Sequence, residues 1–339
     1  MTGSKRKIII WSMTLLCLIL TLTNIFVGSV DIPFDDVFSI LIGHPTDNPA
    51  YHYIIISGRL PQAITALLAG ASLATAGLML QTLFRNPLAG PSILGITSGA
   101  SLGVGIVMLL FGGIVTAGWN SFGGNMAIII GAFIGSFLIM VILIVLSRMI
   151  RSNLSLLIAG MMIGYLATSI VTLLSSVSTA QGIKGYVMWG LGSFSGVPLE
   201  RIGYFAIICL IGLSISLILI KPLNLLLLGD NYAVNLGVNI KKTRTLILLS
   251  TGVLTSIVTA YCGPISFIGL AVPHIARMIL RTDDHKILLP ATILCGACLA
   301  LTCNVISVLP QGNVIPINAL TPIAGVPVVL YVLLQRKKN

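Results

Sequence analysis

Ten apolar segments, each close to the length of a membrane-crossing helix, recur along the chain. A helical crossing needs about 20 predominantly apolar residues, and inside lipid only helices or closed barrels satisfy all backbone hydrogen bonds. The segments therefore predict an all-α polytopic membrane protein with about ten transmembrane helices. The expected limits, in chain order, are about 8–30, 60–83, 93–112, 124–147, 154–176, 202–220, 245–262, 265–281, 287–308 and 318–335.

The amino-acid composition excludes an ordinary soluble domain. Of the 339 residues, 56% are hydrophobic and 8% are charged, whereas soluble domains carry about 25% charged residues. No low-complexity linker interrupts the chain, so residues 1–339 are expected to form a single transmembrane domain. The apolar run 8–30 follows Lys5-Arg6-Lys7 in the manner of a signal peptide. It exceeds the usual h-region of about 7–15 residues and no cleavage site follows it, so we expect it to remain as the first span.

The basic residues are sorted strongly between the two sides of this topology. Lys and Arg near span ends remain cytoplasmic, and sixteen of the nineteen fall on the side that contains both termini. Both termini are therefore expected in the cytoplasm, with the spans in membrane lipid. The net charge of +11 follows from this sorting, so nucleic-acid binding is not expected. The inner set is Lys5, Arg6, Lys7, Arg85, Arg148, Arg151, Lys221, Lys241, Lys242, Arg244, Arg277, Arg281, Lys286, Arg336, Lys337 and Lys338, and the outer set is Arg59, Lys184 and Arg201.

The two long outer segments differ in character. Segment 31–58 is polar enough to be a loop and contains four of the aspartates. Segment 177–201 is too apolar for a plain loop and contains Trp189 and Phe194. Aromatic and apolar residues favour the membrane interface, so this second segment predicts a short helix lying near the interface.

The positions of the acidic residues argue against transport driven by an ion gradient. All eight carboxylates lie in predicted loops, whereas ion-coupled carriers usually bury acidic groups at mid-membrane. Broken helices and backbone carbonyls also bind sodium, so an ion-coupled secondary carrier remains the alternative function. No Gly-x-x-x-x-Gly-Lys-[Ser/Thr] phosphate loop is present, so any ATP must be bound by a partner chain. The carboxylates are Asp31, Asp35, Asp36, Asp47, Glu200, Asp230, Asp283 and Asp284.

Two patterns resemble an enzyme site and a metal site, and we favour a structural interpretation for both. Gly99-Ala100-Ser101-Leu102-Gly103 matches a nucleophile elbow, but that elbow requires a strand-to-helix turn, and this stretch is apolar and helical in pattern. Cys295 and Cys298 share a helical face, but no His or acid lies beside them, so packing is the expected role. We therefore expect no enzyme activity, metal site or cofactor in this chain.

Small residues recur at a spacing of four along several spans. Helices in lipid gain little by burying apolar side chains against each other, so close backbone approach at small residues supplies the packing. The pattern predicts tight helix contacts at Gly99/Gly103, Gly131/Gly135 and Gly160/Gly164.

The most informative cytoplasmic segment is the loop 221–244, in which 229–237 predicts a short helix. Asp230 can cap its first turn by accepting backbone N–H bonds, and Gly237 can supply a left-handed stop. The apolar residues expected on one face are Ala233, Leu236 and Ile240. Such a helix either packs beneath its own bundle or docks into a groove on a soluble partner.

Further motifs complete a family resemblance. They are Arg59-Leu60-Pro61, Gln81–Pro91 with its two prolines, Gly269–Arg277, and Gly325-Val326-Pro327 near the end. With the loop helix, they make nearly the whole chain resemble the FecCD-type permeases of bacterial ABC importers. The resemblance implies the type II importer architecture, with ten helices per subunit and a second permease copy, usually as a homodimer. It also implies two cytosolic ABC ATPase subunits that bind ATP and Mg, an extracytoplasmic substrate-binding protein, and import of iron-siderophore, haem or cobalamin.

The resemblance also assigns roles to individual residues. Those implied for ATPase coupling are Gly229, Asp230, Ala233, Leu236 and Gly237, and those implied for a cytoplasmic gate are Asn86, Leu88, Ser152 and Asn153. Arg59 matches a residue that docks the binding protein, and Lys184 and Arg201 are expected to substitute for the family's other docking basic residues, which this chain lacks. Three positions depart from the family pattern. Gln62 stands where some members have Arg, Asn304 where Asp is usual, and Asn318 where Gly is common.

Overall fold

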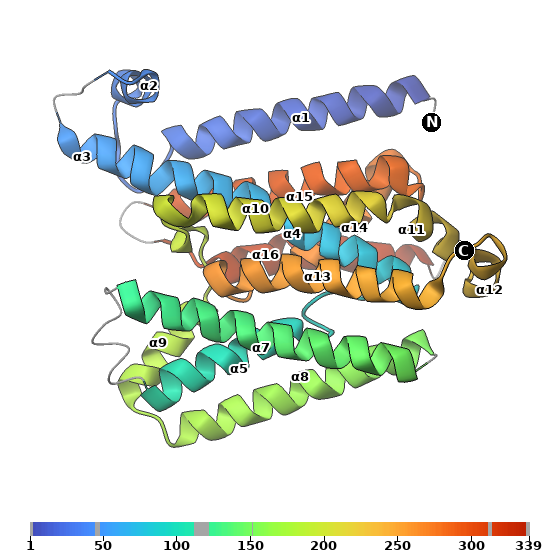
Figure 1. Ribbon diagram of the computed structural model, residues 1–339. Helices are drawn as coiled ribbons and strands as arrows, with labels where there is room; N and C mark the ends of the chain where they lie inside the picture. Colours follow the sequence, from blue (N-terminus) through green and yellow to red (C-terminus); the bar gives the residue numbers. More distant parts are fainter. Residues whose placement is uncertain (1–2, 45–47, 112–121, 151, 311–313, 337–339) are drawn as a thin grey trace.

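The computed structural model describes residues 3–44, 48–111, 122–150, 152–310 and 314–336, and within them the chain folds into one bundle of helices without strands (Figure 1). Asp47, Arg151, Lys337 and Lys338 lie outside the described residues, as does residue 112, the predicted end of the third span. A helix lies at each of the ten apolar segments. These helices are α1 (Gly3–Phe26), α4 (Leu60–Phe84), α5 (Ile96–Gly105), α7 (Phe122–Met149), α8 (Asn153–Ser176), α10 (Leu199–Ile218), α13 (Ile240–Cys262), α14 (Ile268–Leu280), α15 (His285–Val308) and α16 (Ile317–Arg336).

Most of these helices are long enough to cross a membrane. Among the residues that the structure describes, seven helices are long and apolar enough for a crossing, and the regions of α5, α14 and α16 are shorter apolar helices. Shorter helices join the spans, and the predicted helix in 177–201 is present as α9. The connecting elements are α2 (Phe34–Ile42), α3 (Pro49–His52), η1 (Tyr53–Arg59), η2 (Ile106–Leu110), α9 (Ala180–Gly190), η3 (Phe194–Gly196), α11 (Ile220–Leu227) and α12 (Asp230–Asn235).

The segment 31–58 differs from the expected loop. It contains α2 and α3, and the π-helical turn η1 joins α3 directly to α4, so one helix runs from Pro49 to Phe84. Asn48 caps its start by accepting a hydrogen bond from the backbone N of Ala50, and proline is favoured at the first helical position. The π turn ends just before Pro61. The ring of a proline inside a helix clashes with the carbonyl group four residues earlier, and the wider π turn makes room for it. α4 itself matches the predicted span of about 60–83, and the helix that contains it extends back to Pro49.

Helix α4 forms the axis of the bundle. Its most apolar window is 89% buried, whereas the corresponding window of α1 is 17% buried. It packs against α15, α13, α14 and α10. Glycines allow the backbones to touch: a Cβ added at Gly77 would lie 1.7 Å from the Gly269 carbonyl oxygen, and one at Gly70 would lie 2.2 Å from that of Gly296. This is the small-residue packing that membrane helices use.

The glycine pairs predicted from sequence also lie at helix contacts. Between α5 and α7, a Cβ on Gly103 would lie 1.9 Å from the Gly131 oxygen, and one on Gly135 would lie 2.0 Å from the Gly99 oxygen. Added at Gly164, it would lie 3.1 Å from Gly95 Cα at the start of α5. The contacts predicted at these positions are confirmed.

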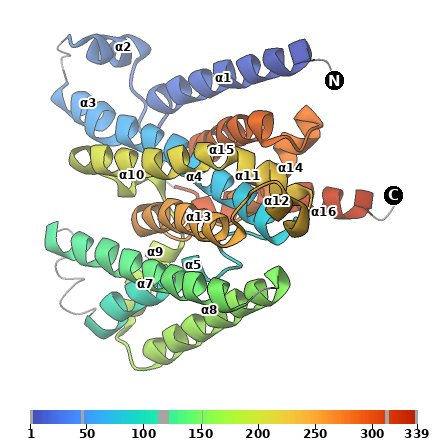
Figure 2. The ribbon, with the colours of Figure 1, turned by 45° about the vertical axis from the view of Figure 1, so that its right-hand side comes forward.

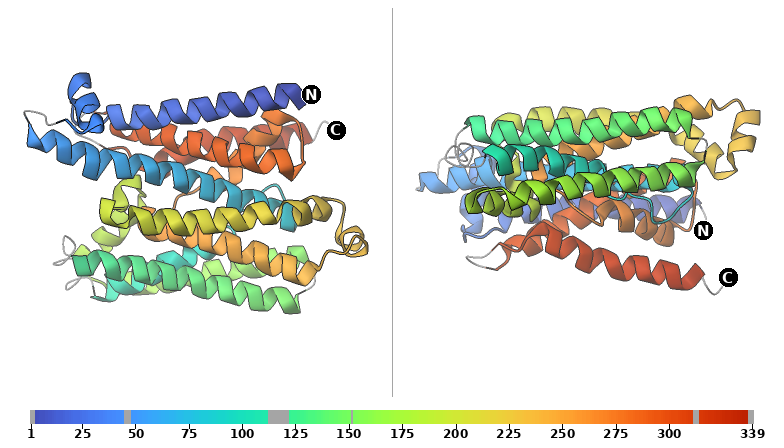
Figure 3. Two further views of the ribbon diagram at one scale, coloured as in Figure 1. Left: turned by 45° about the horizontal axis from the view of Figure 1, so that its top comes forward. Right: turned by 90° about the horizontal axis from the view of Figure 1, so that it is seen from below.

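The two ends of the bundle are chemically different. Both described termini and α12 lie at one end, which we call the α12 end, and α2, α3 and α9 lie at the other, the α9 end (Figures 1 and 3). The predicted inner basic residues that the structure describes begin or end helices at the α12 end. Arg59, Lys184 and Arg201 belong to elements at the α9 end. The predicted sorting of basic residues is therefore present in the fold.

Candidate functional site at the α12 end

Helix α12 is a short, sharply bounded helix outside the spans. Gly229 precedes it with φ +115°, and Gly237 follows it with φ +85°, both in the region that favours glycine. The backbone N–H of Gly237 donates to the Val234 oxygen and that of Val238 donates to the Ala233 oxygen, each at 2.9 Å. These two bonds are the Schellman pattern of helix termination. The predicted left-handed stop at Gly237 is confirmed, whereas Asp230 makes no side-chain cap.

The apolar side chains of α12 do not share one face as predicted. Ala233 is fully buried near α11 and α13, whereas the Leu236 side chain is 58% exposed. The helix ends at Asn235, so the helical spacing no longer applies at Leu236, which turns outward. Tyr232 and Val234 are also exposed. We call Tyr232, Val234 and Leu236 the α12 surface, a set of three exposed apolar residues beyond the membrane spans.

An ion pair connects α12 to the end of the central helix. Arg85 Nη2 lies 2.5 Å from Asp230 Oδ1. Arg85 adopts a left-handed φ of +47° and ends α4. Both side chains are partly exposed, so the pair adds little stability, but it is a direct contact between α12 and the end of α4. The sequence placed both residues in cytoplasmic loops but gave no sign that they pair.

A second connection passes through Arg244 in the first turns of α13. Its Nη1 donates to the Ile150 oxygen at 3.1 Å, near the end of α7, and its Nη2 donates to Asn153 Oδ1 at 2.6 Å. Asn153 Nδ2 in turn donates to the Leu83 oxygen at 2.9 Å. A guanidinium beside the last carbonyls of a helix is favoured by the helix dipole. Arg244 therefore links the segment that follows α12 to α7, α8 and α4.

A third connection fixes α11, the helix that leads into α12. Asn224 Nδ2 donates to Asp284 Oδ1 at 2.7 Å, and Asn224 Oδ1 accepts from the His285 backbone N at 2.8 Å. His285 Nε2 lies 2.9 Å from Thr82 Oγ1 on α4. The Lys286 backbone N–H and the Asn224 amide hold the pKa of Asp284 below its ordinary value, so this cap of α15 stays ionised and able to accept.

The predicted gate residues lie near these connections. Asn86 Oδ1 accepts from the Leu88 backbone N at 2.9 Å, which folds the turn after α4. Ser152 caps α8 by accepting from the Ser155 backbone N. Asn153, described above, joins α8 to the end of α4. The structure thus brings Asn153 to α4, while Ser152 and Asn86 shape their own turns, and a gating role for these residues stays a prediction.

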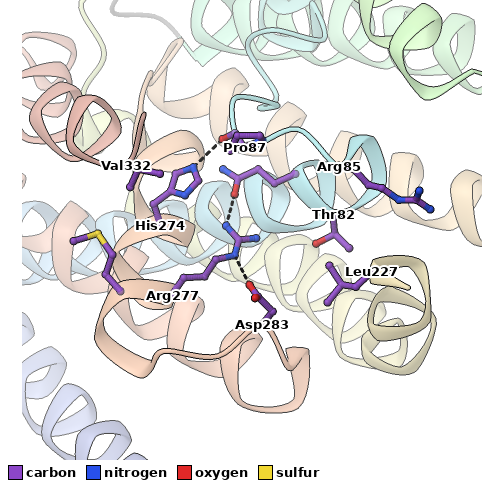
Figure 4. A pocket seen from close by; sticks show the side chains of 10 residues that line it. Thr82, Arg85, Pro87, Leu227, His274, Arg277, Asp283 and Val332 are labelled. Atoms are coloured by element: carbon purple, nitrogen blue, oxygen red, sulfur yellow. Dashed lines mark hydrogen bonds and ion pairs between the residues drawn. The ribbon is translucent and has the colours of Figure 1, made fainter. Parts of the chain in front are cut away.

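Two motifs that were separate in the sequence meet in the wall of a cavity of about 580 Å³ at the α12 end (Figure 4). His274 Nε2 donates to the Pro87 oxygen at 2.8 Å, and Arg277 Nη1 donates to Gln81 Oε1 at 2.7 Å. Arg277 Nε also lies 3.3 Å from Asp283 Oδ1. The Gln81–Pro91 and Gly269–Arg277 motifs therefore hold each other in place. The lining residues are Gln81, Thr82, Arg85, Pro87, Leu227, His274, Arg277, Met278, Asp283 and Val332.

At the opposite end, Arg59 occupies a structural position. Its side chain is 6% exposed, and Nη1 donates to the oxygens of Ile25 and Phe26 at 3.1 and 2.7 Å while Nη2 donates to the Val30 oxygen. A Cβ at Gly28 would lie 2.6 Å from this guanidinium. A residue that docks a partner presents its charge at the surface. Arg59 therefore has a structural role in this fold, and docking of a binding protein by Arg59, Lys184 and Arg201 stays a prediction.

Replacing Arg59 with Met is expected to lower the thermal stability of the purified protein. The change leaves the terminal carbonyls of α1 without a donor, and hydrogen bonds from charged groups contribute about 1.5–3 kcal/mol. Thermal unfolding in detergent measures the effect. Lys184→Met removes an exposed charge at the same end and should change stability by no more than about 0.5 kcal/mol. Equal melting temperatures for the two variants would contradict the structural role.

The departures from the family pattern have structural explanations. Gln62 Nε2 donates to Asn304 Oδ1 at 2.9 Å, and Asn304 Nδ2 donates to Asn24 Oδ1 at 2.7 Å. The two departures at Gln62 and Asn304 are therefore direct partners, and a neutral amide pair joins α4 to α15. Asn318 Nδ2 donates to the Gly190 and Pro264 oxygens, and its Oδ1 accepts from the Ser266 backbone N. A glycine at 318 could not make these side-chain hydrogen bonds and would keep only the backbone bond to the Leu191 oxygen.

Comparisons with known proteins agree with this arrangement. The model of the FecCD transport family matches residues 16–335. The chain is 33% identical to the hemin transport system permease HmuU of Yersinia pestis, covering 99% of this chain and 98% of that protein. It is 35% identical over 284 residues to the vitamin B12 import system permease BtuC of Klebsiella pneumoniae, covering 82% of each.

A solved structure extends the agreement to the fold. It is described as a metal-chelate type ABC transporter in an inward-facing conformation. The two share a TM-score of 0.82 and 31% sequence identity, and the match covers 97% of this chain and 99% of that one. Because the family model spans almost the whole chain, the protein belongs to the FecCD transport family.

Proposed function

We propose that this chain is the permease subunit of an ATP-driven importer in a bacterial inner membrane, carrying a metal chelate such as an iron-siderophore, haem or cobalamin. The observation that carries the proposal is the α12 surface. Three exposed apolar side chains stand on a capped helix outside the spans, at the end that is rich in basic residues. Exposed apolar patches of this kind mark interaction sites, and short helices bind hydrophobic grooves through such side chains.

The proposed assembly contains a second copy of this chain, two cytosolic ABC ATPases and an external substrate-binding protein. ATP and Mg bind the ATPases, because this chain lacks a phosphate loop. Each ATPase receives one α12 surface, and the α12 end with both termini faces the cytoplasm. Lys184 and Arg201, at the α9 end, are proposed to meet the binding protein. The names of the hemin and vitamin B12 relatives support a chelate as cargo.

The proposed mechanism passes through the connections of α12. Closure of the ATPases would displace α12, and the Arg85–Asp230 pair would carry this movement to the end of α4. The bonds from Arg244 to Asn153 and from Asn153 to Leu83 would carry it to α8. The proposed gate residues Asn86, Leu88, Ser152 and Asn153 lie in these turns. ATP shifts the gate because it favours one of two conformations of the whole complex.

The Arg244→Met variant is expected to couple ATP hydrolysis to uptake poorly. It removes the donor that joins α13 to Asn153 and α7 while leaving their neutral acceptors in place, and hydrogen bonds from a charged group contribute about 1.5–3 kcal/mol. ATP-driven uptake per complex should therefore fall sharply. Arg244→Lys, which keeps the charge but not the fork of donors, should be intermediate. Wild-type uptake by Arg244→Met would remove this connection from the mechanism.

Reconstitution tests the energy source directly. Proteoliposomes that contain the permease, its ATPase and its binding protein are expected to take up chelate only when ATP is present on the ATPase side. Proton or sodium gradients without ATP should give no uptake, since none of the described carboxylates lies in the middle of a span. Gradient-driven uptake by the permease alone would identify a secondary carrier and would refute the proposal.

A further inference from the structure

Helix α2 lies across the direction of the spans at the α9 end (Figures 1 and 2). One side of it is buried: Val37 and Ile40 form a small core with Ile25 of α1, Ile55 of η1 and Ala63 of α4. The helix ends at Gly43, which has a left-handed φ of +88°. α2 is therefore a fixed part of the fold, and its other faces are available to its surroundings.

The unburied surface of α2 is divided into an apolar and a polar side. Four large apolar residues are exposed at helical spacing and form the apolar side, which we call the α2 apolar face. Its members are Phe34, Phe38, Leu41 and Ile42, with exposed fractions of 68%, 54%, 38% and 57%. Asp35, Asp36 and Ser39 lie on the polar side. This segregation is the amphipathic pattern of a helix that meets an apolar and an aqueous medium.

The α2 apolar face begins where the lipid-facing surface of α1 ends. The candidate span Ser4–Phe26 has 23 residues, about 34 Å of helix, which matches a hydrocarbon core of about 30 Å. Phe26 therefore lies near the edge of the core. Phe34, the first member of the α2 apolar face, stacks on Phe26 with ring centroids 4.5 Å apart. The apolar face is thus turned toward α1 and the membrane.

The outward side of α1 is continuous with this face. Trp11, Leu15, Leu18 and Leu22 are each at least half exposed and recur at three- and four-residue spacing. Such a stripe on a peripheral span faces lipid. Since Phe26 and Phe34 are in contact at its end, lipid that covers the α1 stripe also reaches α2.

We propose that α2 is an interfacial helix, seated in the boundary between headgroups and acyl chains beside the outer end of α1. Phe34, Phe38, Leu41 and Ile42 enter the acyl region, and Asp35, Asp36 and Ser39 face water. Helices of this kind lie in the membrane plane with their apolar face buried by about 5–10 Å. The partner is a lipid surface, and the inference holds for any transport function of the bundle.

Tryptophan placed on the two sides of α2 tests this position. Phe38→Trp and the matched control Ser39→Trp are made in a background in which Trp11, Trp119 and Trp189 are Phe. Each protein is reconstituted in vesicles of phosphatidylcholine, with or without bromine near the headgroup end of the acyl chains. Emission from position 38 should lose about half its intensity in brominated lipid, because an interfacial helix buries that side chain. Emission from position 39 should be quenched by aqueous iodide instead.

The opposite result would overturn the inference. If position 38 were insensitive to brominated lipid and quenched by iodide, α2 would face water. If that iodide quenching disappeared on adding the purified binding protein, the apolar face would be a protein contact, and the lipid assignment would be wrong. Far-ultraviolet circular dichroism and size-exclusion elution of both variants show that each is folded, so a negative result cannot come from unfolding.

Discussion

Leu236→Asp is expected to abolish ATP-driven uptake while leaving the permease folded. The side chain is exposed and contacts no core, so the change should not disturb the bundle. At the proposed ATPase contact, however, a carboxylate would replace an apolar anchor. Such anchors contribute about 2 kcal/mol or more at an interface, which corresponds to a loss of affinity of about thirtyfold.

The measurement compares ATPase co-purification, basal ATP hydrolysis and uptake in proteoliposomes. Asn231→Asp is the matched control, because it adds the same charge to α12 without removing apolar area. It also places the charge in the first helical turn, where the helix dipole favours a negative group. The control should retain uptake. A Leu236→Asp permease that binds its ATPase and transports normally would show that the α12 surface is not the coupling contact.

Gly77→Ala is expected to prevent correct assembly of the bundle. The added Cβ would lie 1.7 Å from the Gly269 oxygen, which belongs to the backbone of α14 and cannot rotate away. The two helices would have to separate, at a cost of about 1–3 kcal/mol or more. Folded yield after detergent extraction and the melting temperature should both fall.

The control for this substitution is Gly203→Ala in α10, where an added Cβ meets nothing within 4 Å. Both changes add one methyl group to a glycine within a membrane span. Gly203→Ala should therefore behave as the wild type, or be slightly more stable because alanine favours the helix. If Gly77→Ala unfolded at the same temperature as Gly203→Ala, close contact would not be what holds α4 to α14.

The sequence predicted the spans well because membrane insertion is read from local hydrophobicity. The prediction from the sequence was wrong at 49–59, where Ser57 and Gly58 had suggested a loop. That stretch is helical because Ile55 is fully buried against α2 and α4, and this packing has no local signal. The same reasoning applies to the amphipathic helix α2, whose residues are apolar in a segment that was expected to be a plain acidic loop.

The candidate site was predictable in part. Two glycines in left-handed or extended positive-φ positions, Gly229 and Gly237, delimit α12, and glycine spacing is visible in a sequence. The outward side of α12 could not be predicted, because a helix of six residues is too short for the spacing of its apolar residues to define a face. Arg244 and Asn224 were also missed as connecting residues, since their partners lie far away in the chain.

The helix from Pro49 to Phe84, which includes the π-helical turn η1, has a consequence for how the two ends of the bundle are linked. A hydrogen-bonded helix neither stretches nor shortens appreciably, so it transmits axial displacement as a rod does. Near one end of this helix, Arg59 binds the end of α1. At the other end, Arg85 pairs with Asp230 of α12, and Asn153 of α8 binds the Leu83 oxygen. An axial displacement applied at one end of this helix is therefore expected to reach the other end, less whatever bending the π-helical turn η1 takes up.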